Sequence, residues 1–336
     1  MNTEGMFKYL SGLLVVSVAA LAWAMLATLP RHAVGIPEPA LVVQAGIPLA
    51  RWCATLSGFV VVGCSLALVL LGDYGRDRSP SVTRRLSRVM AGMAGVWVVA
   101  ALLGLWLQTA DAASRGLILP VSRVAGYVGH VTLGRALLVS ASFAIGVVVC
   151  SVMVVRRPRF PAAVVMPLGI LGLLAVPMSG HASQWSPRWL LLTADGLHVA
   201  GAALWVGGLA ACVLVVSPDR NALSAVLPGF SRVATVSFGA VAISGVILGT
   251  TRLTGDVTPP VGQLAAALVG SDAGVVLIGK LACLAVLGCS GAYIRQRLVH
   301  AVGRRQAAAV FVTWASFELI LMAVAIALGT AVARPL

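Results

Sequence analysis

The stretch ADGLHVAGAALWVGG, from Ala194 to Gly208, places an acid, a histidine and a tryptophan inside an otherwise apolar segment. On a helical period, five of its residues fall along one stripe: Asp195, His198, Gly201, Trp205 and Gly208. Residues three and four apart share one face of a helix. Ionisable side chains within a membrane segment usually face other protein segments rather than lipid. We therefore interpret the stretch as a membrane helix that presents a polar, ligand-capable stripe to its neighbours.

The composition of the whole chain agrees with a membrane protein. Of its 336 residues, 60% are hydrophobic and 10% are charged, and the mean hydropathy is +1.00. These values are not those of a soluble domain, so we expect an all-α, polytopic membrane protein. Runs long enough to cross a hydrocarbon core of about 30 Å predict about nine transmembrane helices, at 8–30, 48–71, 88–108, 131–155, 161–178, 194–216, 232–252, 274–293 and 308–332.

The fifth of these runs is the weakest, because it is short and carries Pro161, Pro167 and Pro177. Prolines are tolerated in membrane helices when neighbouring groups satisfy the freed carbonyls. The alternative count is therefore eight spans.

The formal net charge of +14 is explained by membrane insertion, and no nucleic-acid partner is needed. Basic residues alternate by loop, with fifteen on one predicted face and eight on the other. Cytoplasmic loops carry the excess of lysine and arginine. The amino terminus is therefore predicted inside and the carboxyl terminus outside.

An internal repeat is indicated by two matched landmarks. Ser87-Arg88-Val89 recurs as Ser231-Arg232-Val233, and Gly134-Arg135 corresponds to Gly279-Lys280. The two separations differ by one residue, and equal topology makes the units parallel repeats. We predict an N-terminal transmembrane helix in residues 1–35, a first four-helix repeat in 36–178 and a second in 179–336.

Histidines and a methionine gather at the predicted outer face, where they suit copper. His130 lies just before the outer end of the fourth span, and His198 lies about one turn into the sixth. His181 follows the fifth span, and Met178 lies three residues before it. Imidazole and thioether are natural copper ligands. Asp195, one turn before His198, could orient its ring through a hydrogen bond.

Three further residues within spans are interpreted as structural or relay groups. Lys280 and Glu318 approach the middle of the bilayer from opposite sides, so an ion pair between them is plausible, as a pin between two helices or as an ion relay. Trp205 is expected to pack between helices. The six cysteines form no CxxC motif, so we expect neither disulfides nor thiolate metal clusters.

These motifs together resemble the bacterial copper resistance protein D family. The resemblance is carried by Ser179-Gly180-His181, by Asp195 with LHVAGAALWVGGL, and by FSRVATVSFGAVAISGVILG from Phe230. Gly279-Lys280-Leu281 and Phe317-Glu318-Leu319 also agree with it. The N-terminal half is similar to longer actinobacterial members, in some of which the unit is fused to a cytochrome-oxidase assembly domain.

The resemblance implies copper handling in the bacterial cytoplasmic membrane, either import or delivery to copper enzymes. The expected partners are copper ion and the lipid bilayer, with a periplasmic copper chaperone or an oxidase assembly protein as a further partner. Two alternatives stay open: a haem b electron-transfer protein with His198 and His130 as axial ligands, and a non-transporting copper chaperone or oxidase assembly factor. No enzyme is expected, because the sequence holds no phosphate-binding loop, Cys-Pro-Cys or HExxH motif.

Overall fold

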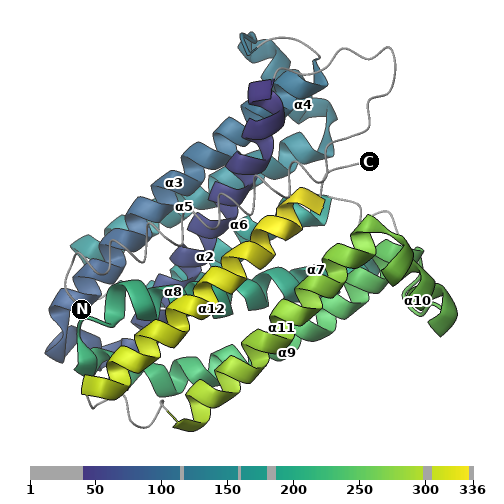
Figure 1. Cartoon of the computed structure of the whole chain (residues 1–336). Coiled ribbons are helices and arrows are strands. Elements are labelled where there is room, and N and C mark those ends of the chain that lie inside the picture. The colour runs from purple at the N-terminus through teal and green to yellow at the C-terminus, as the bar shows by residue number, and fades with distance from the viewer. Residues whose placement is uncertain (1–40, 114–116, 158–159, 180–186, 298–304, 333–336) are drawn as a thin grey trace.

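The computed structural model describes residues 41–113, 117–157, 160–179, 187–297 and 305–332. The described chain consists of helices and their connections, and no strand forms within these ranges (Figure 1). Eight of its helical stretches are long and apolar enough to cross a membrane. This confirms the predicted all-α, polytopic membrane fold.

The first half of the described bundle contains four spans and one short helix. The spans are α2 (Leu41–Arg78), α3 (Pro80–Ala112), α5 (Thr132–Arg156) and a broken span made of η1 (Ala162–Val164), α6 (Val165–Leu174) and η2 (Pro177–Ser179). The short helix α4 (Val121–His130) packs on α3 and α5. These elements lie where the runs at 48–71, 88–108, 131–155 and 161–178 predict them.

Prolines explain why the span at 161–178 is broken. Pro161 precedes the 3₁₀ turn η1, and Pro177 opens the 3₁₀ turn η2. A proline lacks the N–H that a helix interior uses, so it is tolerated mainly in the first turn of a helix. Pro167 occupies that position in α6. The weakest predicted span is therefore present as three short helical pieces.

The second half again contains four spans and one short helix. Its first span is continuous through α7 (Arg188–Ala202), the π-helical turn η4 (Ala203–Gly207), α8 (Gly208–Ala211) and the π-helical turn η5 (Cys212–Val216). The others are α9 (Arg220–Thr254), α11 (Asp272–Arg297) and α12 (Arg305–Val332), with the short helix α10 (Val261–Gly270) between α9 and α11. Gly255, with φ 76°, ends α9 in the left-handed conformation that glycine favours.

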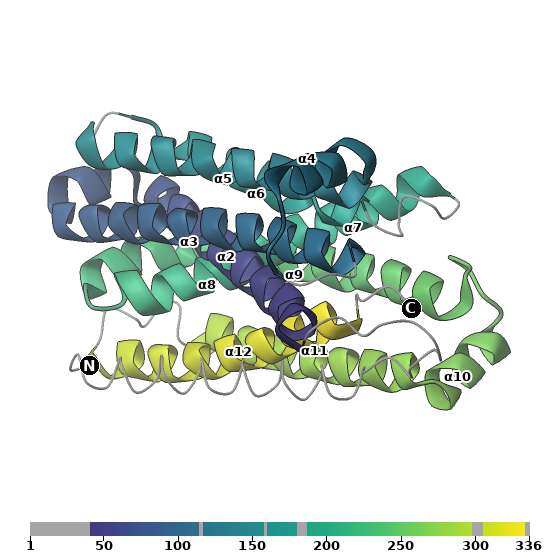
Figure 2. The same ribbon diagram turned by 90° about the horizontal axis from the view of Figure 1, so that it is seen from above.

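The two halves meet where α2 crosses η4. A β-carbon on Gly63 would lie 1.9 Å from the carbonyl oxygen of Gly207, and one on Gly207 would lie 1.9 Å from that of Phe59. Backbone therefore touches backbone at this point, which we call the Gly63–Gly207 crossing. Figure 2 shows α2 running obliquely across the middle of the bundle.

A hydrogen bond also joins the two halves at the end of the bundle where α3 and α9 begin. The hydroxyl of Ser79, at the start of α3, donates to Oδ2 of Asp219 at 3.1 Å. Oδ1 of Asp219 accepts from the backbone N–H groups of Asn221 and Ala222, both at 3.1 Å, and so caps α9. One carboxylate therefore starts α9 and holds it to α3.

The order of helices is the same in the two halves of the described chain. Each half has two long helices, a short helix and two further spans, and Pro120 and Pro260 precede α4 and α10. The boundaries at 36–178 and 179–336 stay a prediction, and the predicted span at 8–30 lies outside the described residues. We call the end of the bundle at which α2, α5, α7 and α11 begin the α4/α10 end (Figure 1).

Candidate functional site

His198 lies within a span and is held against α9. Its Nδ1 atom is 3.1 Å from the hydroxyl oxygen of Ser244. The ring also packs on Gly245, where an added β-carbon would lie 3.4 Å from Cε1. Because α7 supplies the imidazole and α9 supplies both contacts, the packing of these two helices positions the ring.

The hydrogen bonds of Ser244 indicate which nitrogen of His198 carries the proton. The Ser244 hydroxyl donates to the carbonyl of Ala240 at 2.5 Å or of Val241 at 3.2 Å. A hydroxyl has one proton to donate; when that proton goes to one of these carbonyls, the oxygen accepts from Nδ1–H of His198. The Val241 carbonyl, which can only accept, also contacts the imidazole. Nε2 is then the unprotonated nitrogen with a lone pair that can bind a metal.

The stripe read from the sequence packs along α9. Gly201 lies against Ser237, Gly208 lies against Phe230, and the rings of Trp205 and Phe238 meet edge to face with centroids 5.2 Å apart. Trp205 is 8% exposed, as expected for a residue between helices. Only small residues allow two membrane helices to approach so closely. The stripe therefore fixes α7 and α8 on α9 and leaves His198 near the α4/α10 end.

The sequence led us to expect a hydrogen bond from Asp195 to His198, whereas the side chain at hydrogen-bonding distance from Nδ1 of the ring is Ser244. The charged neighbours of Asp195 are Arg51 of α2 and Arg252 of α9. The positive charges of Arg252 and Lys280 of α11 repel each other, and the charge of Lys280 also disfavours a protonated His198. We call Arg51, Arg252 and Lys280 the cationic cluster. It draws on three helices around the Asp195–His198 turn of α7.

Lys280 and Glu318 do not form the ion pair that the sequence suggested. Glu318 of α12 is 4% exposed and approaches Ser290, which lies ten residues beyond Lys280, or about 15 Å along α11. Within the described residues, neither Oε1 of Glu318 nor the Ser290 hydroxyl has a partner at hydrogen-bonding distance. The register of α11 on α12 therefore separates the two charges.

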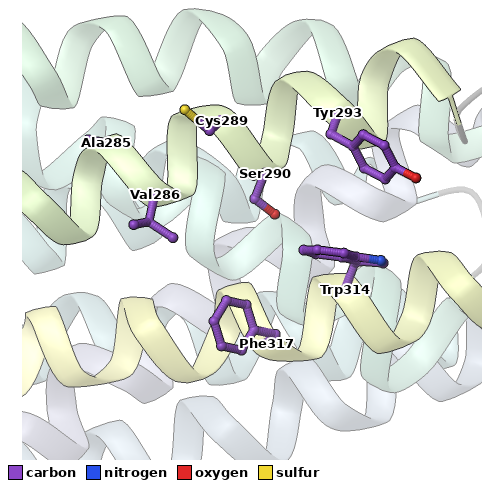
Figure 3. A pocket seen from close by; sticks show the side chains of 7 residues that line it. All are labelled: Ala285, Val286, Cys289, Ser290, Tyr293, Trp314 and Phe317. Carbon is purple, nitrogen blue, oxygen red and sulfur yellow. The ribbon is translucent and has the colours of Figure 1, made fainter.

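A shallow apolar groove opens beside Ser290, between α11 and α12 (Figure 3). It has a volume of about 450 Å³ and is lined by Ala285, Val286, Cys289, Ser290, Tyr293, Trp314 and Phe317. The Ser290 hydroxyl points toward α12, and the rings of Tyr293 and Trp314 have centroids 5.7 Å apart. The groove is a feature of the helix pair that also carries Glu318.

The other predicted copper ligands are less enclosed than His198. His130 is exposed at the end of α4, and Met178 in η2 is 47% exposed. His181 lies outside the described residues. Within the described ranges, no group of three or more His, Cys, Asp or Glu side chains gathers in a way that could hold a metal ion. The structure thus gives His198 a defined environment, whereas the copper-binding roles of His130 and Met178 stay predictions.

Little or nothing in the sequence indicated that the remaining residues around His198 belong to the site. Arg51 and Arg252 fall near the ends of predicted spans and are easily taken for boundary charges, whereas Ser244 has no signal apart from lying on α9. All six cysteines are free, and Cys64 and Cys212 are buried. This agrees with the expectation that they form no disulfide.

Comparisons with known proteins identify the family. Residues 36–189 match the model described as copper resistance protein D-like, N-terminal domain, and residues 224–332 match that of copper resistance protein D. Copper resistance protein D of Pseudomonas syringae pv. tomato is 29% identical over 164 residues, which are 46% of this chain and 50% of that protein. Copper transport protein CutJ of Bacillus subtilis (strain 168) is 26% identical over 189 residues, which are 52% of this chain and 34% of that protein.

The chain therefore spans about half the length of the first relative and about a third of the second. No solved structure matches the chain significantly. The two matched domain models lie in the expected order and together cover most of the chain, including α11, α12 and nearly all of α9. Asp195 and His198 of α7 lie between the two matched regions. The protein is a polytopic membrane member of the copper resistance protein D family.

Proposed function

We propose that this protein binds copper at its α4/α10 end and moves it across the cytoplasmic membrane, with His198 as the ligand inside the bundle. The observation that carries the proposal is the 3.1 Å contact between Nδ1 of His198 and Ser244. It leaves Nε2 as a fixed, neutral donor within a membrane span, and neutral imidazole is a good copper ligand. The names of the two relatives, one of them a copper transport protein, support the choice of metal.

The α4/α10 end is the outer face in this proposal. Arg84 and Arg85 near the start of α3 and Arg156 and Arg157 at the end of α5 lie at the opposite end, which the positive-inside rule makes cytoplasmic. The amino terminus is then inside and the carboxyl terminus outside. Fusing a periplasm-active reporter to the carboxyl terminus tests this orientation, and an inactive reporter would contradict it.

Copper arriving from outside would meet Met178 and His181 first, with His130 on the rim, and would reach His198 about 15 Å from the start of α7. Thioether and imidazole groups coordinate copper reversibly, and no covalent bond of the protein or of a substrate has to break. In this proposal the chain is therefore a carrier rather than an enzyme. A periplasmic copper chaperone is a suitable donor. Acid weakens binding, because protons compete with the metal for imidazole nitrogen.

The test is copper accumulation in sealed right-side-out vesicles, with the bound metal of the purified protein counted in parallel. We expect His198→Ala to lose both accumulation and one bound copper per chain. Ser142→Ala, which removes an exposed hydroxyl on α5 that bonds the Leu138 carbonyl, is the control and should keep both. Unchanged stoichiometry in His198→Ala would overturn the site. Bound copper without accumulation in the wild type would contradict transport and favour a chaperone or assembly factor.

A further inference from the structure

The carboxyl of Glu318 is buried within a membrane span. Glu318 belongs to the apolar stretch Ala309–Ile326 of α12, and its side chain is 4% exposed. Its Oε1 atom has no hydrogen-bond partner in the part of the chain that the structure describes. An ionised carboxylate away from water is stable only when a cation or several hydrogen-bond donors balance its charge. The groups that face Glu318 therefore decide whether it is charged.

The contact between Tyr293 and Trp314 fixes the level of Glu318 on α11. The two ring centroids are 5.7 Å apart, and α11 and α12 run in opposite directions (Figure 1). One turn from this pair, Ser290 on α11 and Glu318 on α12 therefore lie at the same level. Ser290 is 7% exposed, its hydroxyl points toward α12, and it too has no partner among the described residues. The side chain of α11 that faces Glu318 is thus a neutral hydroxyl.

The charged residues of α11 lie away from this level. Lys280 is ten residues before Ser290, or about 15 Å along the helix. Arg295 and Arg297 follow at the very end of α11. The part of α11 beside Glu318 therefore contributes no positive charge.

The other elements that pack on α12 are α2, α8 and η5. Ile326 of α12 packs on Trp52 of α2, so Glu318, eight residues before Ile326, faces α2 about eight residues after Trp52. Arg51 and Asp73 are then at least nine residues, or about 13 Å, from that level. The titratable side chains at or near this level on all these elements and on α11 are thiols and one phenol: Cys53, Cys64, Cys212, Cys283, Cys289 and Tyr293. None of them supplies a positive charge to Glu318.

The Ser290–Glu318 pair is also closed. Oε1 of Glu318 and the Ser290 hydroxyl are both buried, so that a water molecule does not reach them in this arrangement of the helices. Glu318 belongs to no group of three described His, Cys, Asp or Glu side chains that could hold a metal ion. A proton is the one cation that such a site can take, and a protonated carboxyl avoids the cost of a buried charge.

We propose that Glu318 is a proton-binding site, which carries its proton while α11 and α12 are closed and exchanges it with water through the groove beside Ser290. The groove lies in the half of the bundle opposite the α4/α10 end, because α11 ends and α12 begins there. On release, the O–H bond of the carboxyl breaks, the proton passes to a water molecule, and the carboxylate stays on the protein. In combination with the proposed function, on which this part rests, that carboxylate offsets one positive charge of the copper ion that passes.

Infrared spectroscopy of the purified, copper-free protein in lipid at neutral pH tests the site directly, because a protonated carboxyl has a C=O stretching band that a carboxylate lacks. We expect such a band in the wild type, a shift of the band when the proton exchanges in heavy water, and its loss in Glu318→Gln. Glu318→Asp, which keeps a carboxyl, should move the band rather than remove it. Asp256→Asn, which removes an exposed carboxyl after α9, should leave it unchanged.

Two outcomes overturn the proton site. Identical spectra of the wild type and Glu318→Gln in this region would show that Glu318 is ionised. A band of Glu318 that does not shift in heavy water during the time that copper accumulation takes would show a fixed structural hydrogen.

The link to copper is measured in the vesicles with a pH-sensitive dye. We expect copper-dependent proton movement in the wild type and none in Glu318→Gln, which should still bind copper at His198. Copper accumulation with the same proton movement in both proteins would overturn the link. An exchanging Glu318 band in a protein that accumulates no copper refutes the proposed function alone.

Discussion

The Nδ1 atom of His198 lies 3.1 Å from the hydroxyl oxygen of Ser244, so that α9 holds the imidazole of α7 in one orientation. In the proposed site, this contact holds Nδ1 and leaves Nε2 as the nitrogen that would bind copper. The hydroxyl also bonds back to its own helix, which keeps Ser244 in place when the histidine moves. The effect of Ser244 on a metal at His198 can therefore be measured by itself.

Replacing Ser244 with alanine should weaken copper binding without abolishing it. Loss of the group that orients a metal-binding histidine typically costs about 10–100-fold in affinity. Competition with a copper chelator of known affinity measures the change in dissociation constant. Ser142→Ala is the matched control, because its hydroxyl also bonds a carbonyl four residues earlier. Equal affinities of Ser244→Ala and the wild type would contradict the proposed role of the contact.

Replacing Gly63 with alanine should destabilise the bundle. The new methyl group would lie 1.9 Å from the Gly207 carbonyl oxygen, and neither backbone can move without separating α2 from η4. Overpacking of this kind costs about 1–3 kcal/mol or more. Gly92→Ala is the control, since nothing lies within 4 Å of its β-carbon position. Unfolding in sodium dodecyl sulfate should show a clear loss of stability for Gly63→Ala alone, and two equal midpoints would refute the crossing.

The effects of Lys280→Met and Glu318→Gln on stability should add. Residues without shared partners usually couple by no more than about 0.5 kcal/mol, whereas breaking a buried ion pair costs about 3–5 kcal/mol. The double variant is compared with the two single variants in a thermodynamic cycle. A coupling energy above about 1 kcal/mol would show that the two charges interact after all.

Stability should fall in alkaline solution because of Tyr127, which lies in α4 outside the spans. Burial, and then the negative charge of Asp111, raise the pKa of its phenol above the ordinary value. The folded state therefore keeps a proton that the unfolded chain loses above about pH 10. The stabilisation is complete below that pH and is lost as the pH rises further.

Melting temperatures between about pH 8 and about pH 11 measure this loss. Tyr127→Phe should flatten the alkaline decline, and Asp111→Asn should shift the phenol titration back toward its ordinary range. Tyr293→Phe, which leaves the phenol of Tyr127 in place, should decline as the wild type does. An unchanged profile in Tyr127→Phe would count against the assignment.

The sequence predicted the spans and the face of the central helix well, because both depend on local patterns. The apolar runs located all eight described spans, and the stripe through His198 and Gly208 does pack on α9. The partners of the charged residues could not be predicted, since they depend on how helices distant in sequence slide along one another. Counting from span ends placed Lys280 and Glu318 at one depth, but the register of α11 on α12 sets Glu318 beside Ser290. The π-helical turns η4 and η5 were likewise not predicted from the sequence.

The Gly63–Gly207 crossing also bears on how the protein can move. Transporters built from two repeats often work by rocking one repeat against the other around a central site. At this crossing no side chain lies between the two backbones, so there is no layer on which the halves could slide, and Ser79 with Asp219 ties them again where α3 and α9 begin. We therefore expect α2 and η4 to keep their relative position at the crossing. If the protein opens and closes around His198, the movement would fall to α11 and α12, where the groove beside Ser290 leaves room for helices to shift.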